Sequence, residues 1–418
     1  MRERLLQALR ELPLAEADRA RILDYQLATN PLLQPPCLLS SDSSFFDFRG
    51  KVMTLVDHFA PHGLTLNRYL AAVARQPHLI AAAPDTVIEN LESVVHHFRR
   101  QGLTLPEYLR AALRQPSLFA MKSATIIANV ETMIGLFRQA GLPPGSFLRA
   151  ALRQPNLFCR PAATLIANAR RVVARFRPHG LTITAYLRAA CRIHSLLASS
   201  PETVIARIEA VVHELQQDGL MLHTYVPAAL RNPSLFAQSP ATVTANLSCV
   251  ASHFAASGLT LSAYLRAALR LPPLFTLSPA TVIANVESVV NHYRRHGLTL
   301  PEYLRAALRQ PSLFAMKSAT VIRHVDTILA MHRQGLISFA ARDDAQPLRP
   351  FWDYFARNPQ YFTLADDNYA LRIRYAQITA NRPSGFALLK RSRSRIEADL
   401  AHALAQTQGT GNRLHDGK

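Results

Sequence analysis

The sequence predicts an all-α protein, an α-solenoid in which seven or more 39-residue helix-turn-helix repeats form a superhelix with degenerate capping repeats. Three observations predict this fold. The segment GLTLPEYLRAALRQPSLFAMKSAT occurs twice without change, at 102–125 and at 297–320. Hydrophobic residues make up 49% of the 418 residues, enough for a long stacked core. Glycines recur every 39 residues, at 63, 102, 141, 180, 219, 258 and 297, and once more at 335.

The first helix of each repeat, helix A, follows the glycine, which is counted as position 1. Thr104 and Glu107 have the T-x-x-E spacing of a capping box, and Pro106 is tolerated in the first turn. The helix is expected to end at Gln115-Pro116, because proline lacks an amide donor and restricts the preceding residue. The apolar residues have the spacing of one helical stripe: Leu105, Tyr108, Leu109, Ala112 and Leu113.

A short apolar turn and a second helix complete the repeat. The turn, Leu118-Phe119 in the second repeat, is predicted to be a single 3₁₀ turn that fills the core. Helix B begins around Ser278-Pro279 in the sixth repeat, where serine is an N-cap and proline occupies the first helical position. The glycine of the next repeat is expected to end helix B in a left-handed conformation. The buried stripe of helix B in this repeat is Val282, Val286, Val289, Val290 and Tyr293.

The repeat pattern divides the chain into four regions. These are an N-terminal helical cap and half-repeat (1–62), a seven-repeat α-solenoid (63–334), a degenerate C-terminal capping repeat (335–381) and a basic, flexible tail (382–418). Trp352 is expected to pack within the capping repeat. The tail carries the run KRSRSR at 390–395, for which a nuclear address, a phosphate-binding tail and a merely solvated charge run stay open.

Charge points to a polyanionic partner. The formal net charge is +19 and the isoelectric point is about 10.5, so the protein attracts phosphate backbones or anionic membranes. No apolar run approaches the ~18 residues of a membrane span, and no secretory signal stands at the start. We therefore expect a soluble, intracellular monomer without a membrane partner. A nucleus, an organelle and a role as a bacterial effector all stay open.

Arginines are concentrated on the side of helix A that the helical spacing predicts to be exposed, opposite the apolar stripe. Like charges four residues apart on a helix cost about 0.2–0.5 kcal/mol per pair, so stability alone does not select them. Position 9 has gaps at Ala71 and Pro227. The candidate phosphate-binding residues are Arg110, Arg149, Arg188, Arg266 and Arg305 at position 9, and Arg75, Arg114, Arg153, Arg192, Arg231, Arg270 and Arg309 at position 13.

Helix-end electrostatics is the alternative explanation for these rows. An arginine near a helix C-terminus interacts favourably with the helix dipole, typically by about 0.3–1 kcal/mol, and caps free carbonyl groups. This accounts for position 13. It does not account for position 9, which lies one turn further inside the helix. Phosphate binding is therefore the favoured interpretation.

A second periodic set lies at the edge of the helix B stripe. Threonines recur at one phase, at 86, 125, 164, 203, 242, 281 and 320. Asparagine can read adenine in a major groove, but an amide repeated beside a buried face more often ties one repeat to the next, which is the favoured interpretation. The residues four positions after the threonines are Asn90, Asn129, Asn168, Arg207, Asn246, Asn285 and His324.

Nothing in the sequence points to catalysis, a cofactor or a metal. The 16 histidines form no HExxH pattern, and neither GxSxG nor a phosphate-binding loop is present. The four cysteines form no CxxC pair and are interpreted as reduced, packed thiols: Cys37, Cys159, Cys191 and Cys249. We therefore expect a protein that is not an enzyme and holds neither a metal nor a cofactor.

The repeat pattern G-L-T-L-x-x-Y-L-R-A-A-L-R-Q-P-x-L-F, followed by an amphipathic helix, resembles the mitochondrial transcription termination factor (mTERF) family over roughly 31–378. The resemblance implies a curved α-solenoid that binds double-stranded nucleic acid along a positively charged groove. The regular modules are also similar in style to TAL effector-like and octotricopeptide repeat proteins.

The expected function is modular nucleic-acid binding, with duplex DNA favoured over RNA, in transcription regulation or termination. An RNA-binding repeat protein is one alternative. A HEAT- or armadillo-like scaffold for an acidic protein partner is the other.

Overall fold

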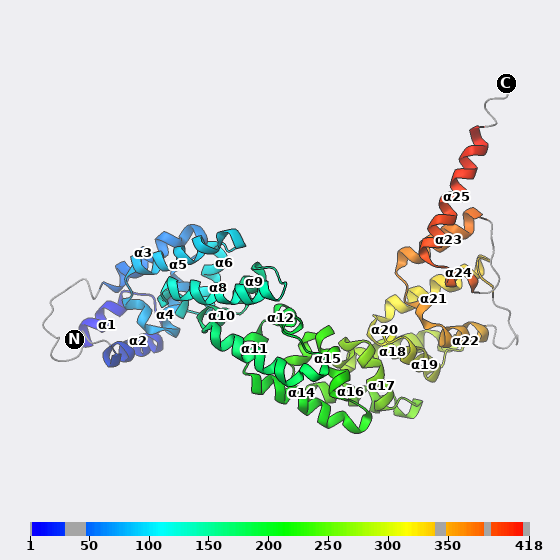
Figure 1. Ribbon diagram of the computed structural model, residues 1–418, viewed down its shortest axis with the longest axis horizontal. Coiled ribbons are helices and arrows are strands. Elements are labelled where there is room, and N and C mark those ends of the chain that lie inside the picture. Colours follow the sequence, from blue (N-terminus) through cyan, green and yellow to red (C-terminus); the bar gives the residue numbers. More distant parts are fainter. Residues whose placement is uncertain (1, 30–46, 339–347, 380–385, 413–418) are drawn as a thin grey trace. The chain divides into compact units, whose positions relative to one another are not determined.

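The computed structural model describes residues 2–29, 47–338, 348–379 and 386–412 (Figure 1). Every regular element within these ranges is a helix, which confirms the predicted all-α class. Tertiary contacts divide the chain into two compact units, Met1–Ala206 and Arg207–Lys418.

Helix A recurs after each glycine and ends where the sequence places a proline or its substitute. Most of these helices begin at position 4 and all end at the arginine of position 13. Their bounds are α4 (Leu66–Arg75), α6 (Leu105–Arg114), α9 (Gly145–Arg153), α12 (Ile183–Arg192), α15 (Leu222–Arg231), α17 (Leu261–Arg270) and α19 (Leu300–Arg309).

The predicted 3₁₀ turn takes two forms. It is 3₁₀ in η5 (Pro77–Ala81), η9 (Pro233–Phe236) and η11 (Pro272–Phe275). Elsewhere it is one turn of α-helix, in α7 (Ser117–Ala120), α10 (Asn156–Cys159), α13 (Ser195–Ala198) and α20 (Ser312–Ala315). In both forms its two consecutive large apolar residues, such as Leu118 and Phe119, are buried.

Helix B is the longer helix of each repeat. It spans α5 (Pro84–Phe98), α8 (Ser123–Gln139), α11 (Ala162–Phe176), α14 (Pro201–Leu215), α16 (Pro240–His253), α18 (Pro279–Tyr293) and α21 (Ser318–Arg333). The sequence predicted that the glycine ends helix B, and this is found in α8 and α21, where a left-handed glycine directly follows the C-cap residue. In most repeats a 3₁₀ turn such as η6 (Arg99–Gln101) intervenes, and the glycine caps that turn: Gly102 has a left-handed φ of 91°. A side chain at such a φ is strained.

Further helices flank the repeats. Before them lie α1 (Arg2–Arg10), α2 (Glu16–Thr29) and α3 (Phe48–Phe59). After them lie α22 (Arg349–Arg357), η13 (Pro359–Phe362) and α23 (Asp366–Thr379), in which Trp352 is fully buried. The predicted flexible tail from 382 is wrong in part, because α24 (Ala387–Lys390) and α25 (Arg393–Asn412) are helical and α25 packs against α23.

Within each unit, consecutive helices A contact one another, and so do consecutive helices B. The apolar stripes of both layers meet in the core, where Tyr108, Leu109 and Val130 are almost fully buried. An aromatic pair ties the first repeat to the second, the second to the third, the fifth to the sixth and the sixth to the seventh. In one of these pairs, the Tyr108 and Phe158 rings meet edge to face with centroids 5.3 Å apart. Such a pair contributes about 0.5–1.5 kcal/mol beyond the apolar area that it buries.

Candidate nucleic-acid interface

All twelve predicted arginines are exposed, on the face of helix A that the helical spacing indicates. Position 9 lies one turn before position 13, so the two rows run beside each other within each unit. The two rows nevertheless form different hydrogen bonds, which indicates that they have different roles.

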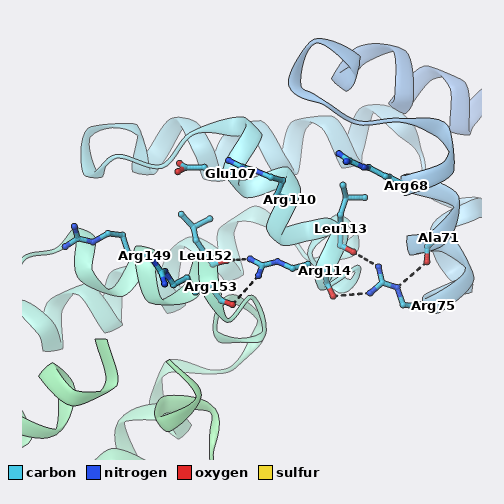
Figure 2. A pocket seen from close by; sticks show the side chains of 10 residues that line it. All are labelled: Arg68, Ala71, Arg75, Glu107, Arg110, Leu113, Arg114, Arg149, Leu152 and Arg153. Carbon is cyan, nitrogen blue, oxygen red and sulfur yellow. Dashed lines mark hydrogen bonds between the residues drawn. The ribbon is translucent and has the colours of Figure 1, made fainter. Parts of the chain in front are cut away.

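Position 13 forms a clasp between repeats. The Arg75 guanidinium donates hydrogen bonds to the carbonyl oxygens of Leu113 and Arg114, the last residues of the next helix A (Figure 2). Arg114 does the same to Leu152 and Arg153. In the second unit, Arg231 clasps Leu269 and Arg270, Arg270 clasps Leu308 and Arg309, and Arg309 donates to the Arg357 carbonyl at 3.3 Å.

The clasp continues into the N-terminal cap. Arg21 of α2 donates to the Ala74 carbonyl oxygen at 3.1 Å, and Gln26 donates to the Pro77 carbonyl oxygen at 3.1 Å. Carbonyl groups at a helix C-terminus have no partner within their own helix and carry partial negative charge. Position 13 therefore caps a helix end, as the electrostatic alternative suggested, but the end belongs to the neighbouring repeat.

Position 9 makes only local contacts. The Arg110 Nε donates to the Pro106 carbonyl at 3.2 Å, one turn earlier in the same helix, and Arg305 does so to Pro301 at 3.4 Å. Arg149 donates to the Ser146 hydroxyl at 3.4 Å. None of these bonds neutralises the arginine charge, so these guanidinium groups can turn toward an anion.

A groove of about 800 Å³ runs along the first three helices A (Figure 2). It is lined by six arginines, the apolar residues Ala71, Leu113 and Leu152, and the single carboxylate of Glu107. The arginines are Arg68, Arg75, Arg110, Arg114, Arg149 and Arg153.

Arg68 was missed by the sequence prediction. It stands three residues before Ala71, the gap at position 9, and therefore on the same helical face. Its guanidinium is exposed, lines the groove and donates to the Gly63 carbonyl oxygen at 3.3 Å. The i, i+3 spacing was the signal that could have found it.

The asparagine set ties repeats together in the part of the chain where its hydrogen bonds are described. The Asn90 Oδ1 accepts from the Ser123 amide at 2.9 Å, at the start of the next helix B. Asn129 accepts from Ala162 and Asn285 from Ser318 in the same way, both at 3.2 Å. Each amide thus acts as an N-cap supplied by the preceding repeat.

The remaining members of this set vary. Asn246 donates to the Phe275 carbonyl at 3.1 Å instead. His324, only 3% exposed, contacts the Phe362 carbonyl at 3.0 Å and the Asp366 carboxylate at 3.2 Å. Asn168 and Arg207 are half-buried in α11 and α14. Bonding between repeats is therefore observed at five of these seven residues.

Three glutamates of helix B each pair with a histidine near the end of the preceding helix of the same layer. His58 pairs with Glu92 at 2.8 Å and His253 with Glu287 at 2.7 Å, in both cases 34 residues apart. His97 pairs with Glu131 in the same way. All these side chains are partly exposed, so each pair contributes no more than about 1 kcal/mol. The acidic charge is thereby held on helix B, away from the arginines of helix A.

Among the described residues, no three or more His, Cys, Asp or Glu side chains are grouped to hold a metal ion. Cys159, Cys191 and Cys249 are unpaired thiols in this part of the structure, and Cys37 lies outside it. Burial raises the pKa of Cys159, which makes a reactive thiolate unfavourable. No described helix is long and apolar enough to cross a bilayer.

Comparison with known families finds no family model that matches the chain, and comparison with curated proteins finds no match.

Proposed function

We propose that this protein binds nucleic acid, duplex DNA in preference to RNA, by gripping the phosphate backbone with arginines of helix A. The biological setting that we propose is the one implied by the mTERF resemblance, transcription regulation or termination. The observation that carries the proposal is the groove in which six arginines face a single carboxylate. Guanidinium groups match phosphate oxygens in charge and in their forked geometry.

The two arginine rows take different parts in this proposal. Position 9 and Arg68 supply the direct phosphate contacts, because their own hydrogen bonds are local. The position 13 arginines hold neighbouring repeats together and add positive electrostatic potential near the phosphate-contacting residues. Helices pack about 10 Å apart, so the row from Arg68 through Arg188 covers about 30 Å, or about nine base pairs at 3.4 Å each.

A salt titration tests the proposal. Affinity for random duplex DNA should fall steeply with salt, because each neutralised phosphate contributes about −0.9 to the slope of log K against log salt concentration. Reversing Arg110, Arg149 and Arg188 to Glu should weaken binding strongly and flatten the slope by about three units. A single-stranded RNA of equal length serves as the comparison for nucleic-acid type.

The matched control reverses three exposed arginines of the same unit outside both rows, Arg100, Arg138 and Arg177. It changes the net charge equally but leaves the groove intact, so the slope should change much less. Equal losses in the two triple variants would show that only the overall charge matters. Unchanged binding by the position 9 variant would eliminate the proposed surface and favour the scaffold for an acidic protein.

A further inference from the structure

A second pocket, of about 330 Å³, lies between the third and fourth helices A. Three guanidinium groups, one imidazole, one hydroxyl and one thiol line it, and no carboxylate is among the described residues that do so. The lining residues are Ser146, Arg149, Arg153, Cys191, Arg192 and His194.

The pocket is lined by residues that depart from the repeat pattern. Position 6 is Ser146 here, where the second and seventh repeats carry Glu107 and Glu302. Position 12 is Cys191, where five repeats carry a leucine, and position 15 is His194, where the six other repeats carry a proline. These changes remove a carboxylate, shorten an apolar side chain and add hydrogen-bonding groups at one junction.

Arg153 also departs from the clasp. Arg75 and Arg114 each donate to two carbonyl oxygens of the next helix A, whereas the Arg153 guanidinium donates no hydrogen bond to the described residues. Its guanidinium therefore keeps its donors for a ligand. Ser146, only 8% exposed, holds the neighbouring Arg149 at 3.4 Å. Burial, with the neighbouring Arg153 charge, lowers the pKa of His194, so at neutral pH its imidazole is uncharged and adds no positive charge to the pocket.

We propose that this pocket binds a terminal phosphate monoester of a nucleic-acid strand, an inference that rests on the proposed function. A phosphodiester carries one negative charge, whereas a terminal monoester carries about −1.5 to −2 at pH 7 and presents three acceptor oxygens. Three arginines that line one pocket without a carboxylate favour the more highly charged group. In the sequence, the run of position 9 arginines is interrupted in the next repeat, at Pro227.

The test compares oligonucleotides of one sequence that carry a 5′-phosphate, a 3′-phosphate or only hydroxyl ends. One phosphorylated form should bind about tenfold more tightly than the hydroxyl form, and inorganic phosphate should compete away that advantage. Which end gains affinity identifies the polarity of the bound strand. Equal binding of all three oligonucleotides overturns the inference.

The variant that tests the pocket restores the repeat pattern, Cys191→Leu with His194→Pro. Proline fits the backbone, because His194 has φ −61° and ψ −26° and Pro155 at the same position has φ −61° and ψ −23°. Binding of the hydroxyl oligonucleotide should persist while the advantage of the phosphorylated one disappears. The control Arg110→Gln should weaken all three oligonucleotides and keep their ratio.

The two proposals fail in different ways. If the wild-type protein binds no nucleic acid, the proposed function falls, and this inference falls with it. If it binds nucleic acid without preferring a phosphorylated end, or if the restored variant keeps the preference, only the terminal-phosphate pocket is wrong.

Discussion

Replacing the position 13 arginines should destabilise the array in the absence of any ligand. Arg114→Gln removes the hydrogen bond to the Arg153 carbonyl, 3.4 Å away, and the shorter one to the Leu152 carbonyl. Hydrogen bonds from charged groups contribute about 1.5–3 kcal/mol when desolvated. Arg114 is exposed and water can solvate the released carbonyls, so the helix-end range of about 0.3–1 kcal/mol is the better guide.

The effect becomes measurable when several junctions change together. Arg75, Arg114 and Arg270 lie at separate junctions, so their losses should add to about 1–3 kcal/mol. The assay is urea unfolding followed by helical circular dichroism, without nucleic acid. Because stability in repeat proteins depends on contacts between neighbours, the transition should also broaden.

The matched control is the triple position 9 variant, Arg110, Arg149 and Arg305 to Gln. It removes the same charge but only bonds within one helix, so its free energy of unfolding should change by less than about 0.5 kcal/mol. If both triple variants lose the same stability, the clasp has no special role. A position 13 triple variant as stable as the wild type would refute the reasoning directly.

Three further outcomes follow from the structure. Asn129→Ala should cost about 1 kcal/mol in urea unfolding, because it removes the cap of the Ala162 amide, and Asn129→Asp should restore most of it. Burial raises the pKa of Tyr264 above its usual value near 10, so above pH 10 the unfolded state loses the phenol proton first and the free energy of unfolding should fall. Tyr264→Phe should lessen that fall by up to about 1.4 kcal/mol per pH unit, measured by unfolding at several pH values. Arg349→Ala should lower the free energy of unfolding by about 3 kcal/mol, because the Glu302 carboxylate, which is 2% exposed and 2.6 Å from the Arg349 guanidinium, loses its ion partner. Adding Glu302→Gln should recover part of this loss, as measured by thermal unfolding.

The sequence pattern predicts much of this fold, because the spacing of apolar residues along each helix determines which face of that helix is buried. It placed Tyr108 in the core and Arg110 in solvent, and both are found there. The acceptors of position 13 could not be predicted in the same way. Helical spacing assigns a side chain to a face of its own helix, but the reach of Arg75 to Arg114 depends on how neighbouring helices are offset along their axes.

The two identical segments show a second limit. Glu107 is half-buried and lines the groove, whereas Glu302, with the same flanking residues, is buried against Arg349. Their capping differs too: the threonine hydroxyl donates to the glutamate at both sites, but the Thr299 amide also donates to Glu302, at 3.1 Å. The environment of each copy comes from the repeat that follows it, which the local sequence does not contain.

The position 13 clasp has a consequence for how such a chain can evolve. Its acceptors are main-chain oxygens, which any amino-acid sequence supplies. Duplication or recombination of the gene can therefore insert a unit without a compensating mutation in the unit it joins. Pairs such as His58 and Glu92 lack this freedom, because each requires a particular partner. The contacts between helices A therefore tolerate the insertion of a new unit, whereas the side-chain pairs between helices B form only between units whose sequences match.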